Sequence, residues 1–381
     1  MIIQSKRVWI AGQFMAAQIE MDGEKIVDIL EYGKKDVDVD YGNDRIVPGF
    51  IDIHTHGYDT WDTNDATPEG LRHWMKSITS EGVTGICPTT ITQSHEVLSN
   101  AVKNVARVVE EGYEGAEILG IHFEGPYLNK AHKGAQPEEF CVKPDVEQFK
   151  RYQEAAHGLI KYISMAVEND DDFALTKYCS QNGVVVSIGH SNATYEQAVL
   201  AFANGARSMT HVYNALTPFT HRANGLVGGA LRIRNMYGEI ICDGNHSTLT
   251  ALNNFFMSKG PDYSIMISDA LMCKGFPEGS KFDFGGQEVV IYPDGSAHLV
   301  EAGNLAGSTL KINKGLQILI EEALVPVNYA INACTCNPAR CLHVDDRKGY
   351  ISVGYDADLV VLDNNYEVVQ TYCKGIGQKT L

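Results

Sequence analysis

Short apolar runs recur through the middle of the chain, and longer mixed stretches separate them. Most runs lack the strict apolar–polar alternation of a half-exposed strand, so they are typical of parallel strands buried on both faces. We therefore predict eight such strands. They lie near residues 45–54, 82–89, 117–125, 159–168, 184–191, 208–215, 238–244 and 264–270.

The stretches between these runs have the spacing of amphipathic helices. Residues 67–82 and 194–205 place apolar side chains at helical intervals, and both end in glycine, which favours a helix that stops there. Eight strand–helix units over roughly 220 residues fit a (β/α)8 TIM-type barrel, for which about 250 residues is typical. The pattern predicts an α/β fold of that kind.

The two ends of the chain have a different, β-like pattern. We predict that residues 1–47 and 343–381 pair into one small β-sandwich domain, and that residues 48–342 form the barrel. Inside the barrel, residues 282–303 are typical of a hairpin insertion with the sequence PDGS as its turn.

Composition and charge narrow the classes of partner. The chain has 381 residues, 44% of them hydrophobic, and a formal net charge of −17. That balance disfavours nucleic acids and anionic membranes, although a local basic patch can still bind a small anion. The nine cysteines are irregularly spaced, which predicts reduced, mostly buried thiols in a cytoplasmic protein. We expect neither a signal peptide nor a membrane span, because no suitable apolar run is present.

Histidines and carboxylates stand at the ends of the predicted strands. The first strand finishes with His54 and His56, and a period of two places both side chains on one face. In a barrel the carboxyl ends of the strands meet at one face, where active sites lie. The strand-end set is therefore expected to converge, and it consists of His54, His56, Glu124, His190, His211 and Asp269.

Imidazole and carboxylate groups suit Zn²⁺ and other first-row divalent ions such as Fe²⁺. Any one of these histidines alone is more simply explained as a hydrogen-bonded structural residue. Six metal-type side chains at predicted strand ends favour a metal site instead.

The chain resembles the amidohydrolase superfamily in PGFIDIHTHG, at the first strand, and in the SDA that ends in Asp269. Within it, the chain is similar to deacetylases of amino-sugar phosphates. The stretches that carry this likeness are GIHFEGPYLNKAHKGAQ (120–136), GHSNATYEQ (189–197), THVYNAL (210–216), ICDGNH (241–246) and LAGS (305–308). The resemblance implies hydrolysis of the acetamide of N-acetylglucosamine 6-phosphate to glucosamine 6-phosphate and acetate, in amino-sugar catabolism.

The resemblance also implies roles for single residues. Glu124, His190 and His211 match the metal ligands that the family generally shares. His54 and His56 match a pair that some members keep for a second ion, so one or two divalent ions per subunit, Zn²⁺ or Fe²⁺, are expected.

Asp269 matches the general acid/base. A bound divalent ion can lower the pKa of its water from 15.7 to about 7, which supplies the nucleophile that an amide needs. A carboxylate beside that water can take its proton and give it to the nitrogen. The alternative is that Asp269 is only a metal ligand.

Further positions match substrate contacts. Arg222 matches an arginine that holds the sugar phosphate and reaches across from a neighbouring subunit, which implies a homodimer. Some members have histidine where this chain has Gln136, whose amide can donate a hydrogen bond but cannot carry charge. The other matched contacts are Ala135, Asn214, Ala215, Asp243, Gly244, Asn245, His246, Leu305, Ala306 and Gly307.

Three alternatives stay open at this point. One is deacetylation of N-acetylgalactosamine 6-phosphate. Another is a different amidohydrolase activity, such as that of a cyclic amidase. The third is a non-catalytic barrel that binds sugar phosphates.

Overall fold

All eight predicted parallel strands form in the computed structural model, which describes residues 1–378. The run predicted at 117–125 is divided into two short strands, so nine strands carry labels. They pair as two sheets, one in the order β10–β9–β6 and one that runs from β11 to β16. Nearly all strand residues are buried, as the missing polar alternation indicates. The strands are β6 (Phe50–Thr55), β9 (Val83–Pro88), β10 (Glu117–Ile118), β11 (Ile121–Glu124), β12 (Ile160–Met165), β13 (Val185–Ile188), β14 (Ala206–Met209), β15 (Tyr237–Ile241) and β16 (Ser264–Ile267).

Main-chain contacts join the two sheets at both edges. Next to β9 and β11, Thr89 and His122 form a parallel bridge. Next to β16 and β6, the Asp269 nitrogen donates to the His54 oxygen at 2.8 Å, and the His56 nitrogen donates to the Ala270 oxygen at 2.8 Å. The strands thus follow one another round a curled parallel arrangement, which confirms the predicted α/β class.

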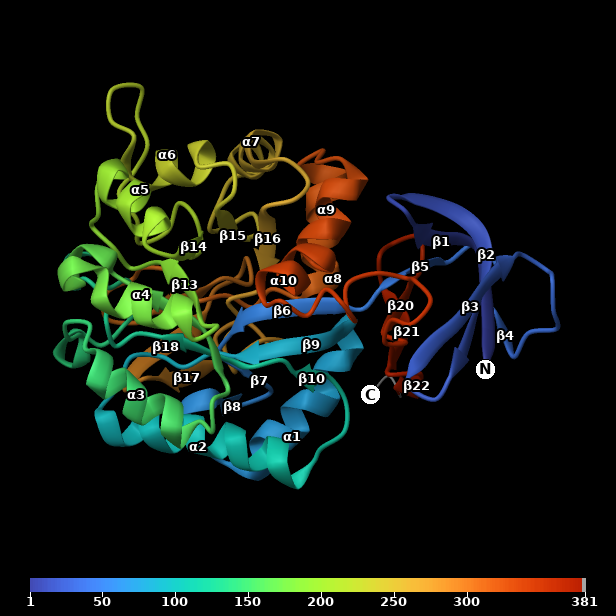
Figure 1. The fold of residues 1–381 in the computed structure, drawn as a ribbon, viewed down its shortest axis with the longest axis horizontal. Coiled ribbons are helices and arrows are strands. Elements are labelled where there is room, and N and C mark those ends of the chain that lie inside the picture. Colours follow the sequence, from blue (N-terminus) through green and yellow to red (C-terminus); the bar gives the residue numbers. More distant parts are fainter. Residues whose placement is uncertain (379–381) are drawn as a thin grey trace.

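Helices cover the outside of this curled sheet (Figure 1). Local sequence sets their starts: the Ser94 side chain accepts from the Val97 nitrogen before α2, and Thr194 and Gln197 form a capping box before α5. Helices α1 and α5 confirm the two helices predicted from periodicity. The helices are α1 (Pro68–Ser77), α2 (His95–Glu111), α3 (Val146–Ala155), α4 (Ala174–Gln181), α5 (Tyr195–Ala203), α6 (Gly225–Arg232), α7 (Leu249–Lys259), α8 (Ile312–Gln317), α9 (Val327–Ala333) and α10 (Cys336–Cys341), with a π-helical segment at Ile318–Glu322.

Strands from the two chain ends pair into one mixed sheet, which carries both termini beside the larger body (Figure 1). Antiparallel pairing of Val47 with Val360 brings the ends together. All eight strands are hydrogen-bonded into one sheet, so the predicted β-sandwich and the boundaries at residues 47 and 343 stay predictions. The strands are β1 (Ile2–Ile10), β2 (Gln13–Asp22), β3 (Lys25–Glu31), β4 (Val39–Asp40), β5 (Arg45–Pro48), β20 (Leu359–Leu362), β21 (Val368–Cys373) and β22 (Ile376–Gln378).

A cluster of charges ties β10 to the segment that leads into β20. Lys348 is fully buried, and its Nζ lies 2.8 Å from Glu117 and 3.2 Å from Asp356, with Asp358 as a third partner. Arg347 binds the Glu117 carboxylate with both terminal nitrogens, at 2.8 and 3.0 Å. These ion pairs hold the curled sheet against the small sheet.

The predicted hairpin at residues 282–303 is a three-stranded antiparallel sheet. Its strands are β17 (Lys281–Phe284), β18 (Gln287–Ile291) and β19 (Ala297–Leu299). The PDGS turn lies between β18 and β19, as predicted. Gly285 and Gly286, both with positive φ, make an additional turn between β17 and β18, where the sequence pattern suggested no break. A further short hairpin pairs β7 (Gly57–Tyr58) with β8 (Trp61–Asp62).

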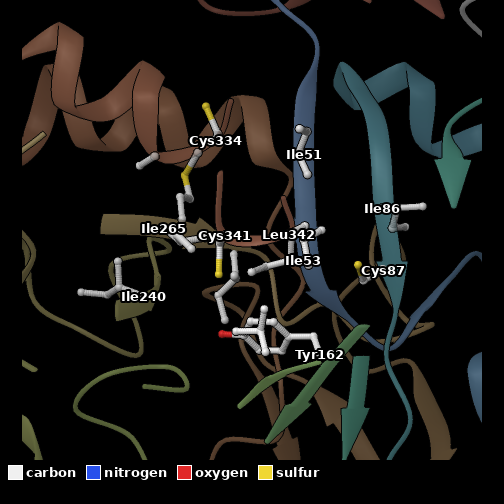
Figure 2. Packing of buried hydrophobic residues seen from close by; sticks show 14 of the residues in the cluster. Ile51, Ile53, Ile86, Cys87, Tyr162, Ile240, Ile265, Cys334, Cys341 and Leu342 are labelled. Atoms are coloured by element: carbon white, nitrogen blue, oxygen red, sulfur yellow. The ribbon is translucent and has the colours of Figure 1, made fainter. Parts of the chain in front are cut away.

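Buried apolar residues of the parallel strands pack with residues of α9 and α10. Figure 2 shows Tyr162, Cys341 and Ile53 close together in this cluster, with Ile240 to one side. All nine cysteines are free and buried, which confirms the prediction of buried thiols. Among residues 1–378, no helix has the length and apolar character to cross a membrane.

Candidate metal centre and active site

The six strand-end residues converge at the carboxyl ends of the parallel strands, as predicted. Their ligand atoms form two compact groups, each with all atoms within 4.8 Å of one another. One group is His54, His56 and Asp269, and the other is Glu124, His190 and His211. All six side chains are buried.

Glu124 lies between the two groups. Its Oε1 is 3.3 Å from the Nε2 of His190, 3.4 Å from that of His211 and 3.4 Å from that of His54. Its Oε2 is 3.4 Å from the Nε2 of His56. Asp269 Oδ1 closes the ring at 3.2 Å from His56 and 3.4 Å from His54. These atoms therefore surround a shared space.

Three of these residues have a strained backbone. His190, His211 and Asp269 adopt positive φ values of 49°, 26° and 50°, which side chains other than glycine rarely do. Each comes two residues after a strand ends, where the chain turns sharply. Such strain persists only where surrounding structure enforces it, and it is concentrated at functional sites.

The second ring nitrogen of three histidines is anchored. His190 Nδ1 faces the main-chain oxygen of His132 at 2.9 Å, and His211 Nδ1 faces that of Asn214 at 3.1 Å. His54 Nδ1 faces the buried carboxylate of Glu239 at 2.9 Å. Because carbonyl oxygens only accept, these contacts put the proton on Nδ1 and leave the Nε2 lone pair for a metal.

The donor set fits a divalent ion. Among the described residues, His54 Nε2 and Glu124 Oε1 are buried without a hydrogen-bond partner. Buried polar atoms nearly always have a hydrogen-bond partner, so two facing atoms without one need an explanation. A bound divalent ion would satisfy both, and imidazole with carboxylate is the ligand chemistry of Zn²⁺ and Fe²⁺.

Burial and charge oppose each other in this cluster. Burial alone would lower the pKa of His54, but the Asp269 and Glu124 carboxylates outweigh it and raise that pKa to about 9. Burial likewise opposes ionisation of Glu124, yet His54 and the other histidines hold its pKa well below the usual value. The carboxylates therefore create a negative potential that attracts either protons on the histidines or a cation in their place.

A cavity of about 260 Å³ opens above the cluster. It brings together seven of the predicted substrate contacts: Ala135, Gln136, Asn214, Ala215, His246, Leu305 and Gly307. Four further lining residues escaped sequence reasoning: Gly134, Ile241, Phe284 and Asn304. Phe284 belongs to β17, and its ring lies 5.2 Å from that of His56. No local signal marks Phe284, because the contact depends on how the inserted sheet folds over the strand ends.

Gln136 is buried beside the metal ligands. Its amide nitrogen donates to Glu124 Oε2 at 2.6 Å, and its amide oxygen accepts from the Thr92 nitrogen at 2.8 Å. The amide therefore orients the Glu124 carboxylate, a contact that the sequence did not suggest.

The other predicted contacts lie outside the lining of this cavity. Arg222 is exposed in the loop between β14 and α6. Asp243 and Asn245 line a neighbouring cavity of about 540 Å³. Asp243 also pairs with His246 Nδ1 at 2.7 Å, so it orients that ring. Gly244 lies between these two residues, and Ala306 is fully buried.

Known proteins share both this sequence pattern and this fold. Residues 45–259 and 277–376 match the Amidohydrolase family. The chain is 39% identical over 333 residues to N-acetylglucosamine-6-phosphate deacetylase of Bacillus subtilis (strain 168), a match that covers 87% of this chain and 83% of that protein. It is 31% identical over 330 residues to N-acetylgalactosamine-6-phosphate deacetylase of Escherichia coli O157:H7, over 87% of this chain and 86% of that protein.

A solved structure extends the likeness to the whole fold. It is a mutant N-acetyl-D-glucosamine-6-phosphate deacetylase from Mycobacterium smegmatis in complex with N-acetyl-D-glucosamine-6-phosphate. The TM-score is 0.93 at 26% identity, with 99% of this chain and 98% of that chain covered. The likeness therefore includes the small sheet as well as the curled parallel sheet.

Proposed function

The chain belongs to the amidohydrolase family and is a hydrolase of amides, and on this premise we propose that it converts N-acetylglucosamine 6-phosphate to glucosamine 6-phosphate and acetate. The observation that carries the proposal is the ring of six buried ligands beneath a cavity. The relatives in Bacillus subtilis and Mycobacterium smegmatis, both named for this sugar phosphate, support the choice of substrate.

We assign the ligands to one or two divalent ions per subunit, Zn²⁺ or Fe²⁺. Glu124, His190 and His211 would hold the first ion, and His54 with His56 would hold the second. When bound, such an ion lowers the pKa of a water and polarises the amide carbonyl. Two groups of three ligands, linked by the distances of 3.4 Å from Glu124 to His54 and to His56, support a binuclear site.

Asp269 is assigned the proton transfers. Asp269 lines the cavity, and its Oδ1 lies 3.2 Å from His56 Nε2 and 3.4 Å from His54 Nε2, where it would face a water held by the ion and act first as a base. It accepts a proton from the attacking water and returns it to the amide nitrogen as the C–N bond breaks. The products are a free amine and acetate, which balances one amide with one water.

The sugar would occupy the cavity. His246, held by Asp243, and the segment Asn214–Ala215 face it from one side, and Leu305 and Gly307 line it. The remaining assigned contacts are Ala135, Gln136, Gly244, Asn245 and Ala306. Their side chains and main-chain groups would select the sugar, since small sites are specified by a few placed polar groups.

We propose that Arg222 binds the phosphate in the active site of a second subunit within a homodimer. A planar guanidinium suits bidentate phosphate binding. Arg222 is exposed. Three apolar side chains are more than half exposed: Leu200 on α5, Met257 on α7, and Phe219 on the loop that contains Arg222. These side chains support a subunit contact on this face.

Mixing two inactive variants tests this arrangement. Subunits with Arg222→Ala keep Asp269, and subunits with Asp269→Asn keep Arg222. Random mixing makes half of the dimers mixed, and each mixed dimer has one complete shared site, so about a quarter of wild-type activity should return. Recovery of no activity from mixed dimers would refute a shared site.

The curled sheet is assigned as a (β/α)8 barrel over residues 48–342, and residues 1–47 with 343–381 as a small β-sandwich domain. The single sheet built from both chain ends and the separate apolar cluster within it support this division. The nine free, buried thiols support a cytoplasmic location.

Acetate release from four sugars tests the substrate. The assay compares N-acetylglucosamine and N-acetylgalactosamine, each with and without the 6-phosphate, on metal-replete protein. We expect N-acetylglucosamine 6-phosphate to have the highest kcat/KM. Equal rates for the phosphorylated and free sugars would refute the phosphate assignment. A higher kcat/KM for N-acetylgalactosamine 6-phosphate would show that this sugar, named for the Escherichia coli relative, is the substrate instead.

A further inference from the structure

Glu239 is a buried carboxylate for which the proposed reaction has no use. It lies in β15, is fully buried, and its Oε2 faces His54 Nδ1 at 2.9 Å. We propose that Glu239 is a positioning residue that fixes the His54 ring with its proton on Nδ1, so that Nε2 of His54, together with His56, retains a divalent ion. This inference rests on the proposed metal-dependent function.

The surroundings of Glu239 offer little else to compensate its charge. Oε2 also accepts from the His211 main-chain nitrogen at 3.4 Å, and Oε1 has no partner among the described residues. No lysine or arginine of residues 1–378 forms an ion pair with it. The neutral hydroxyl of Tyr162 and the thiol of Cys341 are buried beside Glu239, and burial together with its negative charge raises the pKa of both groups. The carboxylate therefore has uncharged neighbours in a medium of low dielectric constant.

The contact determines which nitrogen of His54 faces the other ligands. An ionised carboxylate can only accept, so the His54 proton must be on Nδ1. Nε2 is then a free lone pair, and it lies 3.4 Å from both Glu124 and Asp269. The geometry is that of a carboxylate–histidine–metal triad.

His54 differs in this respect from the other three histidines. Main-chain oxygens, which are uncharged, anchor His190 and His211. His56 Nδ1 is buried without a partner in the described chain. An imidazole that donates its proton to a carboxylate is a stronger electron-pair donor to a metal than one that donates to a main-chain carbonyl. An ion on the far side of the ring would in turn compensate a buried charge that is otherwise costly.

The test measures ion affinity, not turnover. Zn²⁺ binding is titrated against a chromophoric chelator in the wild type, Glu239→Gln, His54→Asn and the double variant. The amide introduced by Glu239→Gln still has an oxygen that accepts from Nδ1, but it lacks the charge. We expect Glu239→Gln to weaken one Zn²⁺ site about 10- to 100-fold, and to have no further effect once His54 is replaced.

A matched control is Asp52→Asn, which changes a buried carboxylate of the same strand as His54. Asp52 accepts from the Ser268 hydroxyl at 2.6 Å and from the main-chain nitrogens of His54 and Ser268 at 3.4 and 3.3 Å, but it contacts no imidazole. Asparagine keeps the oxygen that accepts from these nitrogens and removes only the charge, so Zn²⁺ affinity should stay within about twofold of wild type. Unchanged Zn²⁺ affinity in Glu239→Gln would overturn the proposal. It would also be overturned if Glu239→Gln lowered the affinity of His54→Asn as much as it lowers that of the wild type. A wild type that binds no Zn²⁺ would instead overturn the metal-dependent function, and this inference with it.

A second measurement needs no variant at position 239. The wild type is labelled with ¹⁵N-histidine, loaded with Zn²⁺ and studied by NMR. The His54 ring should carry a slowly exchanging proton on Nδ1 and Zn²⁺ on Nε2. Its signals are assigned by their loss in His54→Asn. Zn²⁺ on Nδ1 would overturn the proposal.

Discussion

Replacement of Lys348 by methionine should destabilise the protein by about 3 kcal/mol, near the low end of the range for breaking a buried ion pair. The ammonium group is fully buried among three carboxylates. Glu117 would keep its two bonds from Arg347, and Asp356 would keep its bonds from Lys25 and Arg347, each at 2.7 Å.

Asp358 would lose Lys348, which is its only side-chain cation among residues 1–378. It is nearly buried, and the main-chain nitrogen of Lys374 at 2.8 Å would be its remaining donor. Burial already raises the pKa of Asp358 despite Lys348. Without the lysine the carboxyl can therefore take up a proton, which limits the cost and is why we place it near the lower end of the range.

Guanidinium unfolding measures the effect, with Lys76→Met as the matched control. Lys76 pairs with Glu114 at 3.0 Å, but both side chains are mostly exposed, so that change should cost less than about 0.5 kcal/mol. Asp358→Asn added to Lys348→Met should recover part of the loss. The reasoning fails if Lys348→Met costs no more than Lys76→Met, or if the added substitution recovers nothing.

Three further predictions concern Glu117, Asp269 and Phe284. Burial opposes ionisation of Glu117, but Arg347 and Lys348 lower its pKa from 4.5 to about 2. The free energy of unfolding should therefore fall as pH drops from about 4.5 towards 2, and Glu117→Gln should flatten that part of the pH profile. Asp269→Asn should lower kcat by about 100-fold or more while the protein keeps the ion of the Glu124 group; loss of an ion by metal analysis would show ligation instead. Phe284→Ala should raise KM by about tenfold with little change in kcat, and a fall in kcat alone would exclude a role in closing the cavity.

The sequence pattern was sufficient to predict the strands because parallel strands are buried on both faces. The ligand positions could be predicted from the same strands. Residues two apart share one face of a strand, and the carboxyl ends of barrel strands meet at one face. The pattern placed several strand ends too late, and β14 shows the largest difference. Apolar character continues to about residue 215, but β14 ends at Met209, because His211 turns into a positive-φ conformation. No pattern of apolar residues reveals such strain.

Contacts that depend on tertiary packing were missed for a different reason. Glu239 sits inside an apolar run, where a lone carboxylate has no visible partner until β15 and β6 come together. Phe284 reaches the cavity only because Gly285 and Gly286 let β17 fold back on β18. Gln136 was noted as a departure from the family pattern, but its bond to Glu124 required the structure.

Acetate release followed during metal removal and return tests the central claim most directly. Protein stripped by a chelator and then dialysed is assayed on N-acetylglucosamine 6-phosphate while Zn²⁺ or Fe²⁺ is added back in measured equivalents. The account predicts no acetate from the stripped protein, and a rise that reaches its limit at one or two ions per chain, with one free amine formed for each acetate. Full acetate release by ion-free protein, or none at any level of added metal, would contradict it.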